Sequence, residues 1–181
     1  MITDILELFP RCRFISNVVI HNISNSAFYI DSVDDFLSTW VNVLSTDSSN
    51  GCILFIDEVQ VFLAKILNNP NTDSYNIFIT ILGQLRKLNC LVILTSQLYN
   101  KVQKCLRDYI IQNGQIVTCK KLIPGVTYYG YYDMVTLEED SKCKLKGKIK
   151  RFDITIHSPE LYQAYDSFKP VVAIKGLLSK K

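Results

Sequence analysis

Residues 51–60 read Gly-Cys-Ile-Leu-Phe-Ile-Asp-Glu-Val-Gln, an unbroken apolar run that ends in two adjacent carboxylates, Asp57 and Glu58. Such runs are typical of buried strands in parallel sheets. Groups that follow these strands lie at the carboxyl edge of the sheet, where open α/β folds bind their ligands. The stretch therefore predicts an α/β fold with both carboxylates at an active edge. A buried strand followed by the acidic N-terminus of a helix would have the same sequence, because carboxylates at that end are stabilised by the helix dipole.

A second apolar segment, residues 91–97, ends in Thr-Ser-Gln and follows a predicted helix over residues 74–87. The order strand, helix, strand requires a crossover, so we expect the two strands to be parallel neighbours. Gln97 is then expected to emerge beside Asp57 and Glu58. An amide at that place can orient an attacking water or sense a terminal phosphate. A helix cap of the Ser96-Gln97 type explains the residues equally well.

A helix predicted over residues 99–112 carries three basic residues at helical spacing, Lys101, Lys104 and Arg107. A solvated basic face accounts for all three. Arg107 is also placed where a helix can bring an arginine to the phosphates of a neighbouring subunit.

Four short motifs together resemble the zonular occludens toxin (Zot)-like ATPases of the FtsK–HerA group of P-loop motors. They are Ile15-Ser16-Asn17, Phe55-Ile56-Asp57-Glu58-Val59-Gln60, Thr95-Ser96-Gln97 and Leu106-Arg107, and the resemblance spans roughly residues 13–120. The resemblance implies a Walker B element with Asp57 on Mg²⁺, Glu58 as general base, Gln97 as polar sensor and Arg107 as a candidate arginine finger.

The resemblance also implies a function and its partners. The intact protein is expected to bind ATP and Mg²⁺, to form a homo-oligomeric ring, and to couple hydrolysis to DNA translocation, packaging or phage export. Phage assembly proteins or membrane proteins are further expected partners, and the cytoplasm of a bacterial host is the expected location. The alternative is a non-catalytic nucleic-acid-binding or assembly module on an inherited α/β scaffold.

One feature of these enzymes is missing from the sequence. The chain contains no G-x-x-x-x-G-K-[ST] motif, whose amides and Lys hold the phosphates, and no Gly precedes Gly51. Residues 1–9 read as the end of a helix leading into a strand over 13–20. We therefore expect a three-layer P-loop NTPase-like fold with a mostly parallel sheet that lacks its first strand and phosphate loop. A split gene, a late start codon, a truncated product and a pseudo-enzyme all fit, so hydrolytic activity stays open.

Two domains are expected, a core over residues 1–122 and a β-rich extension over residues 123–181. Further core elements are a helix over 32–45, a short helix over 59–67 and a strand over 115–119. The extension is expected to hold antiparallel strands over 127–135 and 146–156, a hairpin appended to the sheet, and a short helix beginning at Ser158.

Charge divides the chain as well: residues 1–100 carry a net charge of −4 and residues 101–181 a net charge of +7. A basic half joined to an acidic one suits a protein that grips a polyanion. In one extended strand, five alternating lysines would form a ladder along phosphates: Lys142, Lys144, Lys146, Lys148 and Lys150. Lysines that protect an exposed strand edge from pairing give the same pattern.

Cysteine usage and hydropathy bear on the compartment. The six cysteines show no metal-ligand spacing, which favours free thiols in a reducing cytosol. The sequence has no signal-peptide pattern and no apolar run of membrane-spanning length.

Overall fold

The structure is a computed structural model that describes residues 2–46 and 50–156. These residues form two compact units, which we call the core unit (residues 2–97) and the basic unit (residues 98–156). The short helix expected from Ser158 lies outside the described residues. The predicted domain boundary at residue 122 would fall inside a strand, β5 (Val117–Ile123), of the basic unit.

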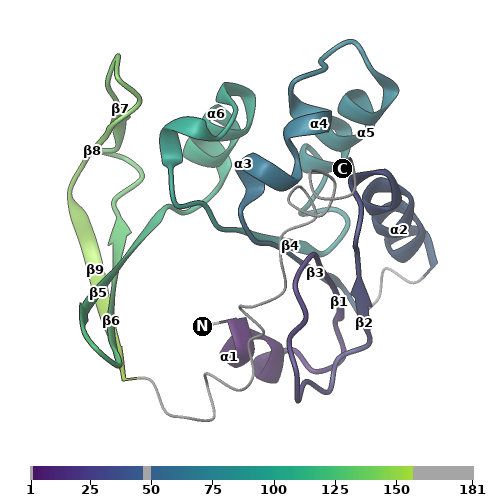
Figure 1. Ribbon diagram of the computed structural model, residues 1–181, viewed down its shortest axis with the longest axis horizontal. Helices are drawn as coiled ribbons and strands as arrows, with labels where there is room; N and C mark the ends of the chain where they lie inside the picture. Colours follow the sequence, from purple (N-terminus) through teal and green to yellow (C-terminus); the bar gives the residue numbers. More distant parts are fainter. Residues whose placement is uncertain (1, 47–49, 157–181) are drawn as a thin grey trace, which may run out of the picture. The chain divides into compact units, whose positions relative to one another are not determined.

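The core unit is a four-stranded parallel sheet with helices on both faces (Figure 1). Its strands run in the order β2-β1-β3-β4, and every neighbouring pair is parallel. The elements in chain order are α1 (Ile2–Leu8), β1 (Arg13–Ser16), β2 (Ala27–Tyr29), α2 (Val33–Thr46), β3 (Cys52–Ile56), α3 (Val59–Phe62), α4 (Ala64–Leu67), α5 (Asp73–Leu82) and β4 (Cys90–Leu94).

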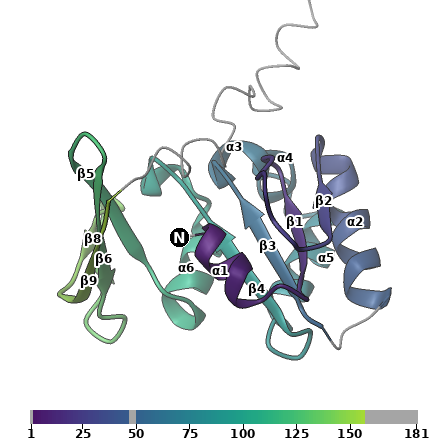
Figure 2. The same ribbon diagram turned by 90° about the horizontal axis from the view of Figure 1, so that it is seen from below.

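Strand β3 is an inner strand of this sheet, and all five of its residues are buried. Leu6 of α1 packs with Phe14, Ile53 and Phe55 on one face. Figure 2 shows α2 and α5 on the opposite face from α1. There the rings of Trp40 and Phe78 lie 6.0 Å apart. The prediction of a P-loop NTPase-like α/β core with three layers agrees with this arrangement.

Helix α2 begins where the sequence predicts it. Ser32 caps the helix, because its Oγ accepts a hydrogen bond from the Asp35 backbone N–H at 3.1 Å. The apolar side chains Phe36, Leu37, Trp40 and Val43 are buried on one face. Apolar residues at helical spacing therefore form the buried face of the helix.

Strand β2 was not predicted, since no strand was expected between the strand over 13–20 and the helix over 32–45. It adds to the edge of the sheet beyond β1, with Ile15 paired to Phe28. Its three residues are half-buried or exposed. A strand so short and so little buried shows no alternation of apolar and polar residues by which the sequence could reveal it.

The basic unit contains a single 3₁₀ turn, one helix and two antiparallel sheets. The elements are η1 (Tyr99–Lys101), α6 (Lys104–Asn113), β5 (Val117–Ile123), β6 (Val126–Tyr132), β7 (Glu138–Glu139), β8 (Leu145–Lys146) and β9 (Ile149–Ile156). Strands β5, β6 and β9 form one sheet in that order, and β7 and β8 form a small hairpin between β6 and β9. The antiparallel pairing of the two predicted segments is confirmed. Their attachment to the parallel sheet was wrong, because both join β5 in a sheet of their own.

Candidate active site

Three strands of the core unit end at one edge of the sheet, and a polar residue follows each of them. These residues are Asn17 after β1, Asp57 after β3 and Thr95 after β4. Because the strands are parallel and in register, the three residues are neighbours. The carboxyl edge therefore presents a continuous polar row centred on Asp57.

Asn17 holds the main chain of Asp57 with both ends of its side-chain amide. Its Nδ2 donates to the Asp57 carbonyl oxygen at 2.9 Å, and its Oδ1 accepts from the Asp57 N–H at 2.8 Å. The amide thereby continues the hydrogen-bond ladder between β1 and β3 for one residue beyond Ser16. Two hydrogen bonds fix this peptide more firmly than a free strand end would be fixed.

Thr95 orients the Asp57 side chain and the peptide that follows it. The Thr95 hydroxyl donates to Asp57 Oδ1 and accepts from the Glu58 N–H at 3.1 Å. The Thr95 main chain bonds the carbonyl of Ile56 and the N–H of Val59, both at 3.0 Å. The Asp57 carboxylate is thus directed by a neighbouring strand and does not move freely.

Glu58 adopts a left-handed backbone conformation, with φ 52° and ψ 53°. For a residue with a side chain this conformation costs about 1–2 kcal/mol. The hydrogen bond from its N–H to Thr95 offsets part of that cost. Non-glycine residues held in this region cluster at functional sites, so strain here supports a working role for Glu58.

Gln60 is the second residue of α3 and contacts Glu58. Its Nε2 donates to Glu58 Oε2. Its Oε1 is buried and has no hydrogen-bond partner in the described part of the chain. A buried amide oxygen without a donor is costly, and it is a hard ligand of the type that Mg²⁺ or its waters prefer.

These side chains fit Mg²⁺ held jointly with phosphates. No group of three or more His, Cys, Asp or Glu suited to a metal occurs within residues 2–46 and 50–156. Mg²⁺ is usually bound by one or two carboxylates together with substrate phosphates, not by an all-protein cage. Asp57 and Glu58 match that donor set.

Gln97 lies further along the chain than the sequence suggested. Strand β4 ends at Leu94, so Thr95 and not Gln97 follows directly beside Asp57. Gln97 is exposed, in a bend. Its sensor role stays a prediction. Thr95 was missed as a site residue, although counting from the paired strand ends, Ile56 and Leu94, would have identified it.

The family comparison agrees with the α/β fold of the core unit. A family model described as Zonular occludens toxin (Zot) matches residues 13–168. The chain belongs to the Zot family. This is a P-loop ATPase-like family of phage proteins, and the parallel sheet of the core unit is consistent with such a fold. No curated protein and no solved structure matches the chain significantly. In the ranges that the structure describes, no helix is both long and apolar enough to cross a membrane.

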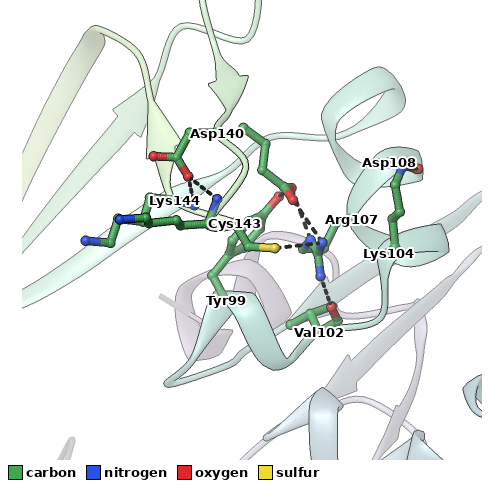
Figure 3. A network of polar contacts seen from close by, with 10 residues as sticks. Tyr99, Val102, Lys104, Arg107, Asp108, Asp140, Cys143 and Lys144 are labelled. Carbon is green, nitrogen blue, oxygen red and sulfur yellow. Dashed lines mark hydrogen bonds and ion pairs between the residues drawn. The ribbon is translucent and has the colours of Figure 1, made fainter.

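Arg107 is held inside the basic unit by an ion pair (Figure 3). Its Nε and one terminal nitrogen donate to the two carboxylate oxygens of Glu139 at 3.0 and 2.9 Å. The same guanidinium donates to the Val102 carbonyl and lies over the Tyr99 ring. The Tyr99 hydroxyl donates to Glu139 at 3.0 Å. These contacts join α6 to the β7–β8 hairpin.

The five lysines of the predicted ladder are all exposed, but they do not share one strand. Lys142 and Lys144 lie in a turn, where both backbone N–H groups donate to Asp140 Oδ1. Lys146 is in β8, Lys148 lies in the link that follows, and Lys150 is in β9. The expectation of a single extended ladder was therefore wrong. Their role in nucleic-acid binding stays a prediction.

Proposed function

We propose that this Zot-family chain supplies the Walker B part of an FtsK–HerA-type ATPase that couples ATP hydrolysis to DNA translocation, packaging or phage export. The observation that carries the proposal is the Asp57 carboxylate, which Thr95 orients beside the strained Glu58. Two carboxylates with different partners at one sheet edge suit two different tasks. Asp57 suits the Mg²⁺ of a nucleotide, and Glu58 suits the attacking water.

In this proposal each residue of the site has a separate role in hydrolysis. Mg²⁺, when bound, neutralises charge on the phosphates. Asp57 holds it at the end of β3, and Glu58 takes the proton from the water that attacks the terminal phosphate. Gln97 is the proposed sensor of that phosphate. An arginine-finger role for Arg107 would require the guanidinium to leave Glu139, so the ion pair sets the condition for that role.

The open edge of β4 supports a place for the phosphate-binding loop. Strand β4 pairs with β3 only, among the described strands. All five of its residues are apolar or Cys, yet none is fully buried, and Leu91 is 44% exposed. Runs of this kind are typical of central strands. We propose that a further parallel strand, carrying the phosphate loop, adds to this edge in the working enzyme.

The chain alone is expected to bind ATP·Mg²⁺ weakly, because the loop amides and lysine make most phosphate contacts in P-loop proteins. We expect calorimetric titration to give a Kd well above the micromolar range. Micromolar binding by residues 1–181 would contradict the proposal that the phosphate site is completed by another segment.

A second candidate function is a non-catalytic nucleic-acid-binding or assembly module. It is favoured by the net charge of +5 carried by residues 98–156. The first candidate gives the chain DNA as a partner, and the second does so where the module binds nucleic acid. A homo-oligomeric ring, phage assembly or membrane partners, and a bacterial cytoplasm belong to the first candidate.

Replacing Lys144, Lys146 and Lys148 with Gln tests whether the lysines contact phosphates. Each lost contact lowers the salt slope of log affinity by about 0.7–0.9. Lys146 Nζ lies 3.6 Å from Asp140 Oδ2 and is already paired, so we expect the slope to fall by roughly 1.4–1.8 from two contacts. DNA affinity measured at several salt concentrations gives the slope.

The control is Lys101→Gln, an exposed lysine of η1 outside the lysine segment. If the lysines instead protect strand edges, the triple variant keeps its DNA affinity and scatters light as it aggregates. An unchanged slope in the triple variant contradicts the phosphate contacts.

A further inference from the structure

The three-stranded sheet of the basic unit exposes the face that its sequence predicts to be covered. Strand β9 alternates, with Phe152, Ile154 and Ile156 on one face and Asp153 and Thr155 on the other. The three apolar side chains are 65%, 55% and 79% exposed, whereas both polar residues are half-buried. The register adds Val126 and Tyr128 of β6 to the apolar face, which we call the outer face.

The centre of the outer face is a stacked aromatic pair. The Tyr128 and Phe152 rings are 6.1 Å apart with an interplanar angle of 22°. Gly130 pairs with Phe152 and lies two residues after Tyr128, and a Cβ there would come within 2.9 Å of the Tyr128 hydroxyl and of Ile149 Cδ1. Because Gly130 has no side chain, the Tyr128 ring can lie flat along the strand. The Tyr128 and Phe152 rings therefore form a flat platform.

Three lysines lie on or next to the two strands that flank β6. Lys120 of β5 is directly opposite Tyr128 in the register, on the other side from β9. Lys148 precedes β9, and Lys150 is the second residue of β9, at the shift in register between β6 and β9. None of these three lysines takes part in an ion pair that the structure records among residues 50–156. The outer face is therefore apolar and aromatic at its centre, with Lys120 beside Tyr128 on β5 and two further lysines at the beginning of β9.

We propose that the outer face binds single-stranded nucleic acid, with bases stacked on Phe152 and Tyr128 and phosphates beside Lys120, Lys148 and Lys150. Aromatic platforms flanked by basic grooves bind single strands with little sequence preference. Bases in a duplex stack on one another, so their ring faces are not offered to a platform. This inference rests on the proposed function only in naming a nucleic acid as partner.

Charge disfavours the main alternative occupant, a second copy of this face. Two copies stacked face to face would bring two units of net charge +5 together. A polyanion instead gains from the same lysines. The flat arrangement of the two rings also suits planar bases better than insertion into a lipid surface.

The test measures the fluorescence anisotropy of a labelled oligothymidylate about 20 nucleotides long in the presence of residues 1–181. The solution contains no ATP and no Mg²⁺. Phe152→Leu keeps an apolar side chain but removes the ring, and we expect it to weaken binding about 5- to 150-fold. Phe152→Tyr keeps the ring and is expected to restore affinity. Val135→Ser, at a residue 93% exposed in the same unit, is the control and is expected to change nothing. Circular dichroism checks the fold of each variant.

Three results would overturn the proposal. Equal affinity for duplex and single strand, unaffected by Phe152→Leu, indicates charge attraction alone. Concentration-dependent self-association that Phe152→Leu abolishes, without oligonucleotide binding, indicates a second copy. Binding to anionic phosphatidylserine vesicles in place of the oligonucleotide indicates a membrane surface. The assay contains no ATP, so a negative result leaves the ATPase proposal intact. A failure of the ATPase proposal likewise leaves the oligonucleotide result unchanged.

Discussion

Glu58→Gln is expected to reduce ATP hydrolysis roughly 10²-fold or more in a version of the protein that includes a phosphate loop, while nucleotide binding is kept. Gln has the shape of Glu and can still accept a hydrogen bond from Gln60. It cannot take a proton from water. The change therefore removes the proposed base while leaving the left-handed turn at residue 58 in place. Steady-state hydrolysis and nucleotide titration on the same preparation separate the two effects.

Glu7→Gln is the matched control for this prediction. Glu7 is an exposed carboxylate of α1 in the same unit, and its replacement makes the same chemical change away from the sheet edge. We expect Glu7→Gln to hydrolyse ATP at the original rate. Unchanged turnover in Glu58→Gln would remove Glu58 from the role of general base.

The parallel core was predictable because its signals are local. The apolar run before Asp57 is a wholly buried strand, and the crossover rule correctly made it a parallel neighbour of residues 90–94. The contribution of Thr95 was not predicted, because it depends on where β4 ends. A difference of a few residues at that strand end exchanges Thr95 for Gln97 beside Asp57. Sequence patterns locate element ends less well than elements.

The lysine segment, residues 142–150, shows a second reason why the sequence did not predict the structure. Alternation alone favours a strand over residues 142–150, but two backbone features interrupt it. Cys143 adopts a positive φ of 55°, and a Cβ at Gly147 would come within 2.9 Å of Leu137 Cδ1. The turn around Asp140 and the packing of Leu137 are contacts between segments, which a period-two pattern does not contain.

The position of Arg107 could not be predicted because it depends on a contact with a residue distant in the sequence. Its spacing from Lys101 and Lys104 suggests one exposed basic face, and the exposed Lys104 does pair with Asp108 at 2.6 Å. Arg107 instead faces Glu139, 32 residues later in the chain. The helical period places Arg107 on a face, but only the hairpin supplies the partner that buries it.

Arg107→Ala is expected to destabilise the basic unit by about 3–5 kcal/mol, because it would leave the largely buried Glu139 carboxylate without its cation. The two side chains are 7% and 18% exposed, and the guanidinium also contacts Val102 and Tyr99. Few apolar residues of this unit are buried, so we expect local unfolding of residues 98–156. Hydrogen exchange and denaturant titration measure the loss.

The pH dependence of that loss has a definite sign. The Arg107 guanidinium holds the pKa of the Glu139 carboxyl below its usual value. The stability from the pair is therefore complete above the ordinary glutamate pKa and disappears as the pH falls through the lowered pKa of the folded state. The difference in unfolding free energy between Arg107→Ala and the original chain should be largest near neutral pH and shrink in acid.

A double variant separates the structural role of Arg107 from an arginine-finger role. Arg107→Met with Glu139→Leu removes both charges and fills the space with apolar groups, a change that is often neutral or stabilising for buried ion pairs. We expect it to recover most of the stability lost in Arg107→Ala. If the recovered double variant also hydrolyses ATP normally in a protein with a phosphate loop, Arg107 acts through the fold. If stability returns and hydrolysis does not, the arginine reaches the phosphates during turnover, and its pair with Glu139 is a resting position.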